Sequence, residues 1–225
     1  MPLDSKTLMP KERFPKCVLC GPRQWWFGVA LNTVGLSGPG VENLLKRGLW
    51  QKRTEPFMLS FMAVGKTAEE RLQEWQNFLL LLSRSYVKFG ASFGIQLNIT
   101  CPNTGLYLLR LGLVEETIKI LDTVGKFPII RKNVPVLVKV SVTISPEAAK
   151  EIGEHPHCAG LIVSNTIPFG WEGIPVKKWK QWFGSSHISP LRTRGIPVAD
   201  GLSGKPLLLL VVMWVKNLRA LGFAK

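Results

Sequence analysis

Hydrophobic and polar residues in the middle of the chain follow two alternating patterns. Short apolar runs without charges, typical of strands in a parallel sheet, alternate with stretches whose apolar residues recur every three or four positions, as in amphipathic helices. The predicted strands are residues 56–63, 94–101, 134–142 and 160–164. The predicted helices are residues 66–88 and 113–127, and a third that Ser145 caps. The run at 56–63 predicts a strand buried on both faces.

The helix predicted at 66–88 has a recognisable start and a recognisable buried side. Thr67 is placed to cap it, and Glu69 and Glu70 follow in the first turn, where carboxylates favour the positive end of the helix dipole. Apolar residues at spacings of three and four define its buried side. They are Leu72, Trp75, Leu79 and Leu82.

Strands that alternate with helices predict right-handed βαβ units around a parallel sheet. A doubly wound sheet and a (β/α) barrel both satisfy this pattern. Residues 167–204 show little period and are predicted to form a long loop, and residues 205–223 form a last helix with Pro206 in its first turn. We expect one domain over residues 1–225.

Polar residues follow three of the predicted strands at their carboxyl ends, where both fold types place their chemistry. They are the segment 98–103, Lys139 with Ser141, and Asn165 with Thr166. We expect the strands near 57–63, 94–101, 134–142 and 158–164 to be adjacent and parallel. Asn98, Lys139 and Asn165 should then lie on one face and form one polar pocket.

Composition describes a globular protein. Of the 225 residues, 46% are hydrophobic and 20% are charged, which excludes a disordered chain. No apolar run reaches the roughly 18 residues of a membrane helix, and the first 16 residues lack a signal-peptide core. Four cysteines do not make a disulfide framework at this length. We expect a cytoplasmic protein without a membrane partner.

The net charge of +14 is concentrated at the two ends of the chain, with nine basic and two acidic residues in 167–225. This excess indicates either an ordinary solvated surface or an anionic partner. One alternative is a nucleic-acid-binding protein, because the stretch from Trp171 to Trp182 interleaves tryptophans with Lys177, Lys178 and Lys180. A basic surface alone is a weak indication, so we expect no nucleic-acid partner.

Three residues near the strand ends carry candidate chemistry. Asn98 and Asn103 offer neutral amides that suit a planar polar ligand, and Cys101 lies between them in a proline-containing turn. The Cys101 thiol is either a base or nucleophile or a buried structural group. Lys139 either points outward or meets an anion or an electron-rich cofactor, because a lysine deep in a parallel strand is otherwise costly.

Other motifs are weaker. The glycine-rich segment 201–205, predicted as a turn that opens a helix, could present backbone N–H groups to an anion, but it lacks P-loop spacing. Cys17 and Cys20 have the spacing of half a zinc knuckle without partners, so no metal site is expected. The chain has no GxSxG, HExxH or GxGxxG motif, which argues against serine hydrolases, zinc proteases and Rossmann dehydrogenases.

Several segments in order resemble the dihydroorotate dehydrogenase family over nearly the whole chain. They are Asn98-Ile99-Thr100-Cys101-Pro102-Asn103, the Lys139 strand, Ser164-Asn165-Thr166, Gly201 to Pro206, Asn32 to Leu36, and Ser5-Lys6-Thr7. The resemblance implies an FMN-dependent (β/α)8 TIM barrel. It also implies oxidation of dihydroorotate to orotate in pyrimidine (UMP) biosynthesis.

The resemblance assigns roles to individual residues. Cys101 would be the general base that takes a proton from substrate C5 while a hydride passes from C6 to the flavin, and Lys139 would lie against the flavin ring. The implied cofactor contacts are Lys6, Thr7, Asn98, Lys139, Ser164 and Gly204. The implied substrate contacts are Lys6, Asn32, Thr33, Val34, Gly35, Leu36, Asn98, Asn103, Asn165 and Thr166.

The sequence departs from the family at two points. The barrel is incomplete, with about strands 2 to 6 of eight, and the units that normally hold the FMN phosphate are missing. Asp200 stands where the family usually has glycine. An alternative is therefore a catalytically silent barrel fragment. Features of the soluble and membrane-associated branches are mixed, so the electron acceptor (fumarate, NAD or quinone) stays open, as does a homo-oligomeric state.

Overall fold

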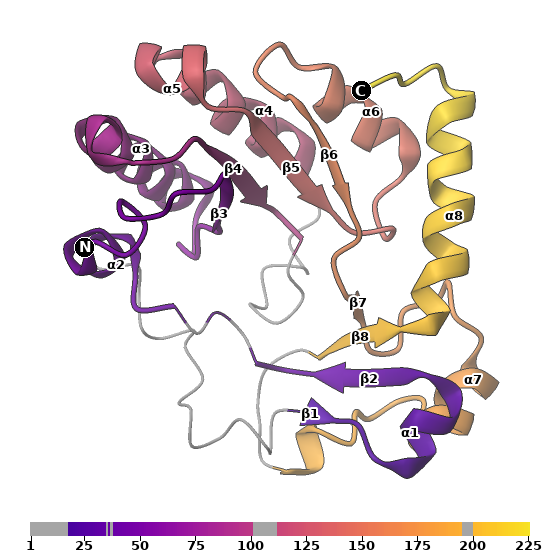
Figure 1. Ribbon diagram of the computed structural model, residues 1–225. Coiled ribbons are helices and arrows are strands. Elements are labelled where there is room, and N and C mark those ends of the chain that lie inside the picture. Colours follow the sequence, from indigo (N-terminus) through magenta and orange to yellow (C-terminus); the bar gives the residue numbers. More distant parts are fainter. Residues whose placement is uncertain (1–17, 35, 37, 101–111, 195–199) are drawn as a thin grey trace.

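The computed structural model describes residues 18–34, 36, 38–100, 112–194 and 200–225, which form an α/β structure with two four-stranded sheets (Figure 1). The first sheet is parallel, in the order β3-β4-β5-β6, and the second is antiparallel, in the order β1-β2-β8-β7. The strands of the first sheet are β3 (Phe57–Phe61), β4 (Phe93–Asn98), β5 (Val136–Val140) and β6 (Gly160–Val163). Those of the second are β1 (Val18–Leu19), β2 (Val29–Asn32), β7 (Ile167–Pro168) and β8 (Gly201–Gly204).

Helices follow the strands of the parallel sheet and flank the small one. The helices are α1 (Pro22–Phe27), α2 (Val41–Arg47), α3 (Ala68–Ser85), α4 (Leu113–Gly125), α5 (Pro128–Asn133), α6 (Pro146–Glu154), α7 (Val176–Phe183) and α8 (Lys205–Ala220), with 3-10 turns at Tyr86–Lys88 and Arg192–Arg194. None of the helices among the described residues is long and apolar enough to cross a membrane.

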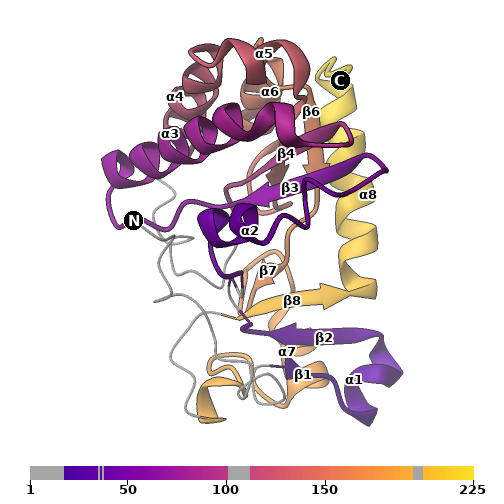
Figure 2. The ribbon, with the colours of Figure 1, turned by 60° about the vertical axis from the view of Figure 1, so that its left-hand side comes forward.

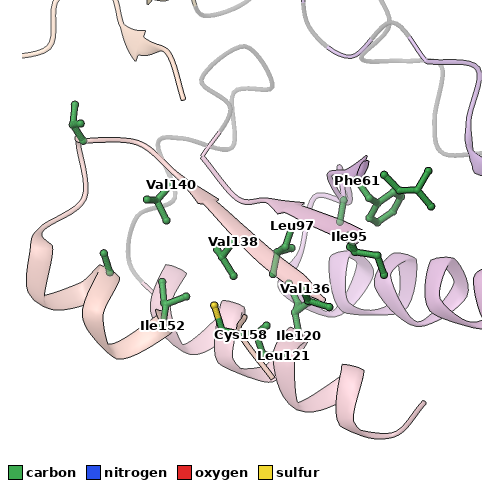
Figure 3. Close-up of a cluster of buried hydrophobic side chains, with 14 of the residues drawn as sticks. Phe61, Ile95, Leu97, Ile120, Leu121, Val136, Val138, Val140, Ile152 and Cys158 are labelled. Atoms are coloured by element: carbon green, nitrogen blue, oxygen red, sulfur yellow. The ribbon is translucent and has the colours of Figure 1, made fainter. Parts of the chain in front are cut away.

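The four predicted strands are adjacent and parallel, which confirms that expectation. Leu97 lies beside Val138, and Val138 lies beside Leu161. On the face of the sheet that carries Leu97 and Val138, the valines, leucines and isoleucines of β4 and β5 pack against α4 and α6. These helices supply Ile120, Leu121 and Ile152 (Figure 3). Burying branched side chains between the sheet and its helices is the main stabilising contribution of a βαβ unit.

Helix α3 starts as the sequence predicts. The Thr67 side-chain oxygen accepts from the Glu70 N–H at 3.1 Å, and the Glu70 carboxylate accepts from the Thr67 N–H at 3.3 Å, which is a reciprocal capping box. The helix packs its aromatic side on β3, where the Phe61 ring stacks on Phe78 at 4.1 Å and meets Trp75 edge-on at 4.6 Å. The predicted helix over 66–88 is thus confirmed, with a 3-10 turn as its last part.

The prediction that the 56–63 strand is buried on both faces is wrong. Leu59 and Phe61 are buried against the helices, whereas Ser60 is exposed and Met58 is 43% exposed on the opposite face. A closed barrel fills its interior with such side chains. The described residues form no closed barrel and place no second layer over this face of β3. The sheet is compatible with part of a (β/α) barrel.

The segment 167–204, predicted as a long loop, contains two strands, helix α7 and a 3-10 turn. Trp179, Trp182 and Phe183 are buried, at spacings of three and four that place them on one side of α7. This spacing was visible in the sequence as a helix signal. Because both tryptophans are in the core, they cannot stack on nucleic-acid bases, which removes most of the aromatic support for a nucleic-acid-binding protein.

The small sheet lies beyond the carboxyl end of β6, which leads into β7 within four residues (Figures 1 and 2). From β8 the chain continues into α8, which returns along the parallel sheet and packs on α6. The Trp214 indole N–H donates to the Ile144 carbonyl at 2.8 Å, and the Phe223 ring lies against Gly153. These contacts attach the last helix to the parallel sheet.

Candidate functional site

Two asparagines from different parts of the chain meet at the carboxyl ends of the parallel strands. The Asn165 amide nitrogen donates to Asn98 Oδ1 at 2.8 Å and approaches Thr100 Oγ1 at 3.4 Å, and all three residues are buried. Asn98 ends β4, and Asn165 follows β6, so this contact spans β5. The arrangement confirms that the polar ends of the strands come together.

The chain after β6 fixes the direction of the Asn165 amide. Its Oδ1 accepts from the Thr166 N–H at 3.0 Å, so its nitrogen is the atom turned towards Asn98. Ser164 Oγ donates to the Asn165 carbonyl at 2.6 Å. Asn98 uses Oδ1 as the acceptor, and its NH2 group donates to none of the described residues, so it can serve as a donor to a ligand. The site therefore presents N–H groups, which suit carbonyl or carboxylate oxygens of a ligand.

Lys139 adds a positive charge beside these amides. It pairs with Asn98 in the β4–β5 register, so the two side chains lie on the same face of the sheet. The residue is half-buried, and its carbonyl accepts from Thr100 Oγ1 at 3.4 Å. No acidic side chain in the described part of the chain forms an ion pair with it. A half-buried ammonium next to amide donors suits an anionic or electron-rich ligand.

The prediction that Asn98, Lys139 and Asn165 share one face is confirmed by these contacts. Other predicted site residues lie outside the described part of the chain, and their roles stay predictions. These are Cys101, Asn103, Lys6, Thr7 and Gly35.

The predicted substrate loop begins in the small sheet. Asn32 ends β2, and its amide nitrogen donates to the Gly201 carbonyl of β8 at 3.2 Å. Thr33 is fully buried, and Val34 and Leu36 are half-buried. The role of this segment in lining the substrate stays a prediction.

Residues 201–204, predicted as part of a glycine-rich turn, form strand β8 instead. They pair with β2 over four residues, and this long-range pairing outweighs the turn tendency of the glycines. Gly204 has a φ of +108°, and a Cβ there would lie 2.2 Å from the Gly28 carbonyl oxygen. The close approach of β2 explains glycine at this position. Gly204 lies at the opposite end of β8 from the Asn32 pair, and its flavin contact stays a prediction.

Asp200 is a buried carboxylate next to β8. Its carbonyl accepts from the Phe169 N–H at 3.1 Å, while its side-chain Oδ1 has no hydrogen-bond partner among the described residues. Burial raises the pKa of Asp200 above its ordinary value, and a hydrogen bond with Ser189 and the charge of Arg192 oppose this shift in part. A carboxylate held this way destabilises the fold when it is ionised.

An ion pair that the sequence analysis did not identify lies beside the site. Arg71 of α3 donates from Nε to one Glu116 oxygen at 2.6 Å and from Nη2 to the other at 2.5 Å, which is a bidentate pair with α4. This pair raises the pKa of Arg71. Together with Asn98 and Trp75 it lines a cavity of about 40 Å³, which has room for water rather than for a cofactor. The residues are 45 positions apart, so no local pattern could reveal them.

Comparison with protein-family models finds no match. Curated proteins that are similar over part of the chain include two dihydroorotate dehydrogenases. The chain is 28% identical over 142 residues to dihydroorotate dehydrogenase A (fumarate) of Lactobacillus delbrueckii subsp. bulgaricus, covering 61% of this chain. It is 31% identical over 143 residues to the catalytic subunit of dihydroorotate dehydrogenase B (NAD(+)) of a Geobacillus species, covering 62% of this chain.

The chain spans 42% of the length of each of these relatives. The similarity indicates a relationship to dihydroorotate dehydrogenases, in agreement with the resemblance of the motifs. The two relatives differ in the electron acceptor that their names give, so the comparison favours neither acceptor for this chain.

Proposed function

We propose that this chain belongs to an FMN-dependent oxidoreductase of the dihydroorotate dehydrogenase type. The observation that carries the proposal is the buried Asn98–Asn165 pair beside the half-buried Lys139, at the carboxyl ends of three neighbouring parallel strands. The partial similarity to two dihydroorotate dehydrogenases supports it. Oxidation of dihydroorotate to orotate in pyrimidine synthesis is the corresponding reaction.

The chemistry of the site fits these ligands. Dihydroorotate carries ring carbonyls, ring N–H groups and a carboxylate, and carboxamides such as Asn98 and Asn165 can complement the carbonyls and the N–H groups. Lys139 would lie against the flavin ring and stabilise negative charge there. FMN, when bound, supplies the acceptor for the substrate hydride. Cys101 remains the proposed general base, and its exchange for alanine should lower turnover much more than orotate binding.

The described residues fit one end of the cofactor better than the other. Lys139 and the amides supply groups for the flavin ring and the substrate, but Gly201–Gly204 is a paired strand rather than an open phosphate-binding turn. The proposal therefore concerns the ring and substrate end of the site.

Titration of FMN with the purified chain tests the proposal, with quenching of flavin fluorescence as the signal. Lys139→Met should weaken FMN binding about 10-fold or more, because a charge-assisted contact contributes about 1.5–3 kcal/mol. Lys132→Met is the matched control. Lys132 is exposed and lies before the amino end of β5, away from the carboxyl end that carries the site. Equal affinities of the two variants, or no quenching by the unmodified chain, would contradict the proposal.

A second candidate is a catalytically silent relative, which the buried Asp200 favours. Its carboxylate stands where the family usually has glycine, and one of its oxygens has no hydrogen-bond partner in the part of the chain that the structure describes. In this case the unmodified chain should fail to bind FMN. Binding that is restored in Asp200→Gly would identify the carboxylate as the cause. If Asp200→Gly also fails to bind FMN, the cause lies elsewhere.

A further inference from the structure

Helix α8 exposes apolar residues on the side away from the protein. Leu208, Leu209, Val212 and Met213 occupy two successive turns, and Leu209 is 66% exposed. On the opposite side of the helix, Trp214 and Leu218 are buried. A surface helix normally carries polar residues on its outer side. An exposed apolar group of this size indicates an interaction surface.

Two exposed tryptophans lie at the base of the same helix. Trp25 and Trp26 of α1 are 68% and 86% exposed. Helix α1 ends at Gly28, whose carbonyl accepts from the Lys205 N–H at 2.7 Å, so α1 adjoins the first turn of α8. Figures 1 and 2 both show α1 below the start of α8 on the same side of the molecule. We call Trp25, Trp26, Leu208, Leu209, Val212 and Met213 the α1–α8 patch.

The charged residues of α1 and α8 themselves are all basic. Neither α1 nor α8 contains an acidic residue, Arg23 lies in α1, and Lys205 and Lys216 lie before and after the exposed apolar turns of α8. Helix α6, which packs on α8, does contain acidic residues. The acidic residues of α6 are Glu147, Glu151 and Glu154, partly balanced by Lys150.

We propose that the α1–α8 patch binds the surface of an anionic lipid membrane. Leucine, valine and methionine side chains on a convex helix can enter the boundary between head groups and acyl chains without a matching groove. Tryptophan favours this depth, and lysines beside the apolar residues can reach anionic head groups. A second copy is a poorer partner, because it carries the same net charge of +14.

This mode of contact is peripheral. It differs from the expectation that the protein has no membrane partner, which rested on the lack of a long apolar run and of a signal peptide. An interfacial helix needs neither, because it lies in the plane of the membrane and inserts only one side. The proposal does not depend on the proposed function.

Vesicle co-sedimentation of the full chain tests the proposal. Vesicles of phosphatidylcholine with about 30% phosphatidylserine should bind the protein at least about 10-fold better than phosphatidylcholine alone. The double variant Leu209→Gln/Val212→Gln should bind about 10-fold more weakly. Lys205→Gln and Lys216→Gln should each reduce binding about fivefold. Leu49→Gln is the matched control, because Leu49 is 63% exposed and lies just after α2, and it should bind normally.

Circular dichroism and the molar mass in solution accompany each variant. Weak binding by a folded monomeric Leu209→Gln/Val212→Gln variant supports the proposal. Absence of binding to the anionic vesicles overturns it, as does equal binding to both lipid compositions. A doubled molar mass that the same variant abolishes would also overturn it, since the patch would then be an interface between copies. If Leu49→Gln lost as much vesicle binding as Leu209→Gln/Val212→Gln, the loss would not be specific to the α1–α8 patch, and the assignment would be refuted.

Discussion

Exchange of Asn165 for alanine should destabilise the fold by more than the loss of one exposed hydrogen bond would. The residue is buried, its nitrogen donates to Asn98 Oδ1 at 2.8 Å, and its oxygen accepts from the Thr166 N–H at 3.0 Å. A hydrogen bond contributes about 0.5–1.5 kcal/mol net, and a buried partner left unpaired costs about 1–3 kcal/mol. We therefore expect the free energy of unfolding to fall by about 2–4 kcal/mol.

A double-mutant cycle isolates the contact between the two asparagines. Asn98→Ala alone should also be destabilising, because it leaves the Asn165 nitrogen without its shortest hydrogen bond. The double variant removes both partners, so its loss in free energy of unfolding should be smaller than the sum of the losses in the two single variants. We expect a coupling energy of about 1–2 kcal/mol, above the roughly 0.3–0.5 kcal/mol found for independent positions.

Urea unfolding followed by tryptophan fluorescence measures these free energies, and the chain has eight tryptophans. Asn133→Ala is the control. Its amide donates at 2.8 Å to the Ile129 carbonyl one turn earlier, at an exposed position, so the loss should stay below about 1 kcal/mol. Additive losses in the cycle, or an Asn165→Ala loss no larger than that of Asn133→Ala, would refute the account of a buried amide network.

Three further variants test other parts of the structure. Because folding raises the pKa of Asp200, the protonated carboxyl group contributes stability that is complete below about pH 4 and is lost as the pH rises through the pKa of the folded state. Asp200→Asn should therefore raise the melting temperature at about pH 7 and not at about pH 3.5. A lower melting temperature of this variant at about pH 7 would contradict the prediction. Glu116→Gln weakens the bidentate pair with Arg71 and should cost about 1.5–3 kcal/mol in urea unfolding, whereas a loss below 0.5 kcal/mol would show that the pair is unimportant. Gly204→Ala should cost about 1–3 kcal/mol, because a Cβ meets the Gly28 carbonyl, and an unchanged urea midpoint would refute the close β2–β8 approach.

The parallel sheet was predictable because its signals are local. Apolar runs marked β3 to β6, and Thr67 and Ser145 marked the starts of α3 and α6, where their side chains accept the N–H groups of Glu70 and Ala148. The general rule that parallel strands end at one edge then placed Asn98, Lys139 and Asn165 together. These site residues were predictable from the sequence because the common direction of the parallel strands brings their carboxyl ends to the same edge of the sheet.

The small sheet was not predictable from the same signals. Strands β1 and β7 have only two residues each, and β8 has the sequence Gly-Leu-Ser-Gly, which is typical of a turn. They form because β2 and β8, about 170 positions apart, pair across four residues, and such long-range pairing leaves no local pattern. The Arg71–Glu116 pair was missed for the same reason. The exposure of Met58 was missed because the run at 56–63 has the apolar character of a barrel strand.

Anaerobic reaction of the FMN-loaded chain with dihydroorotate tests the central claim most directly, namely that the polar strand ends form a site for this substrate beside a flavin. The account predicts that dihydroorotate bleaches the visible flavin band and that orotate forms in an amount equal to the flavin reduced, and that Asn165→Ala slows the bleaching. Flavin that is bound but keeps its absorbance in the presence of saturating dihydroorotate, with no orotate formed, would contradict it.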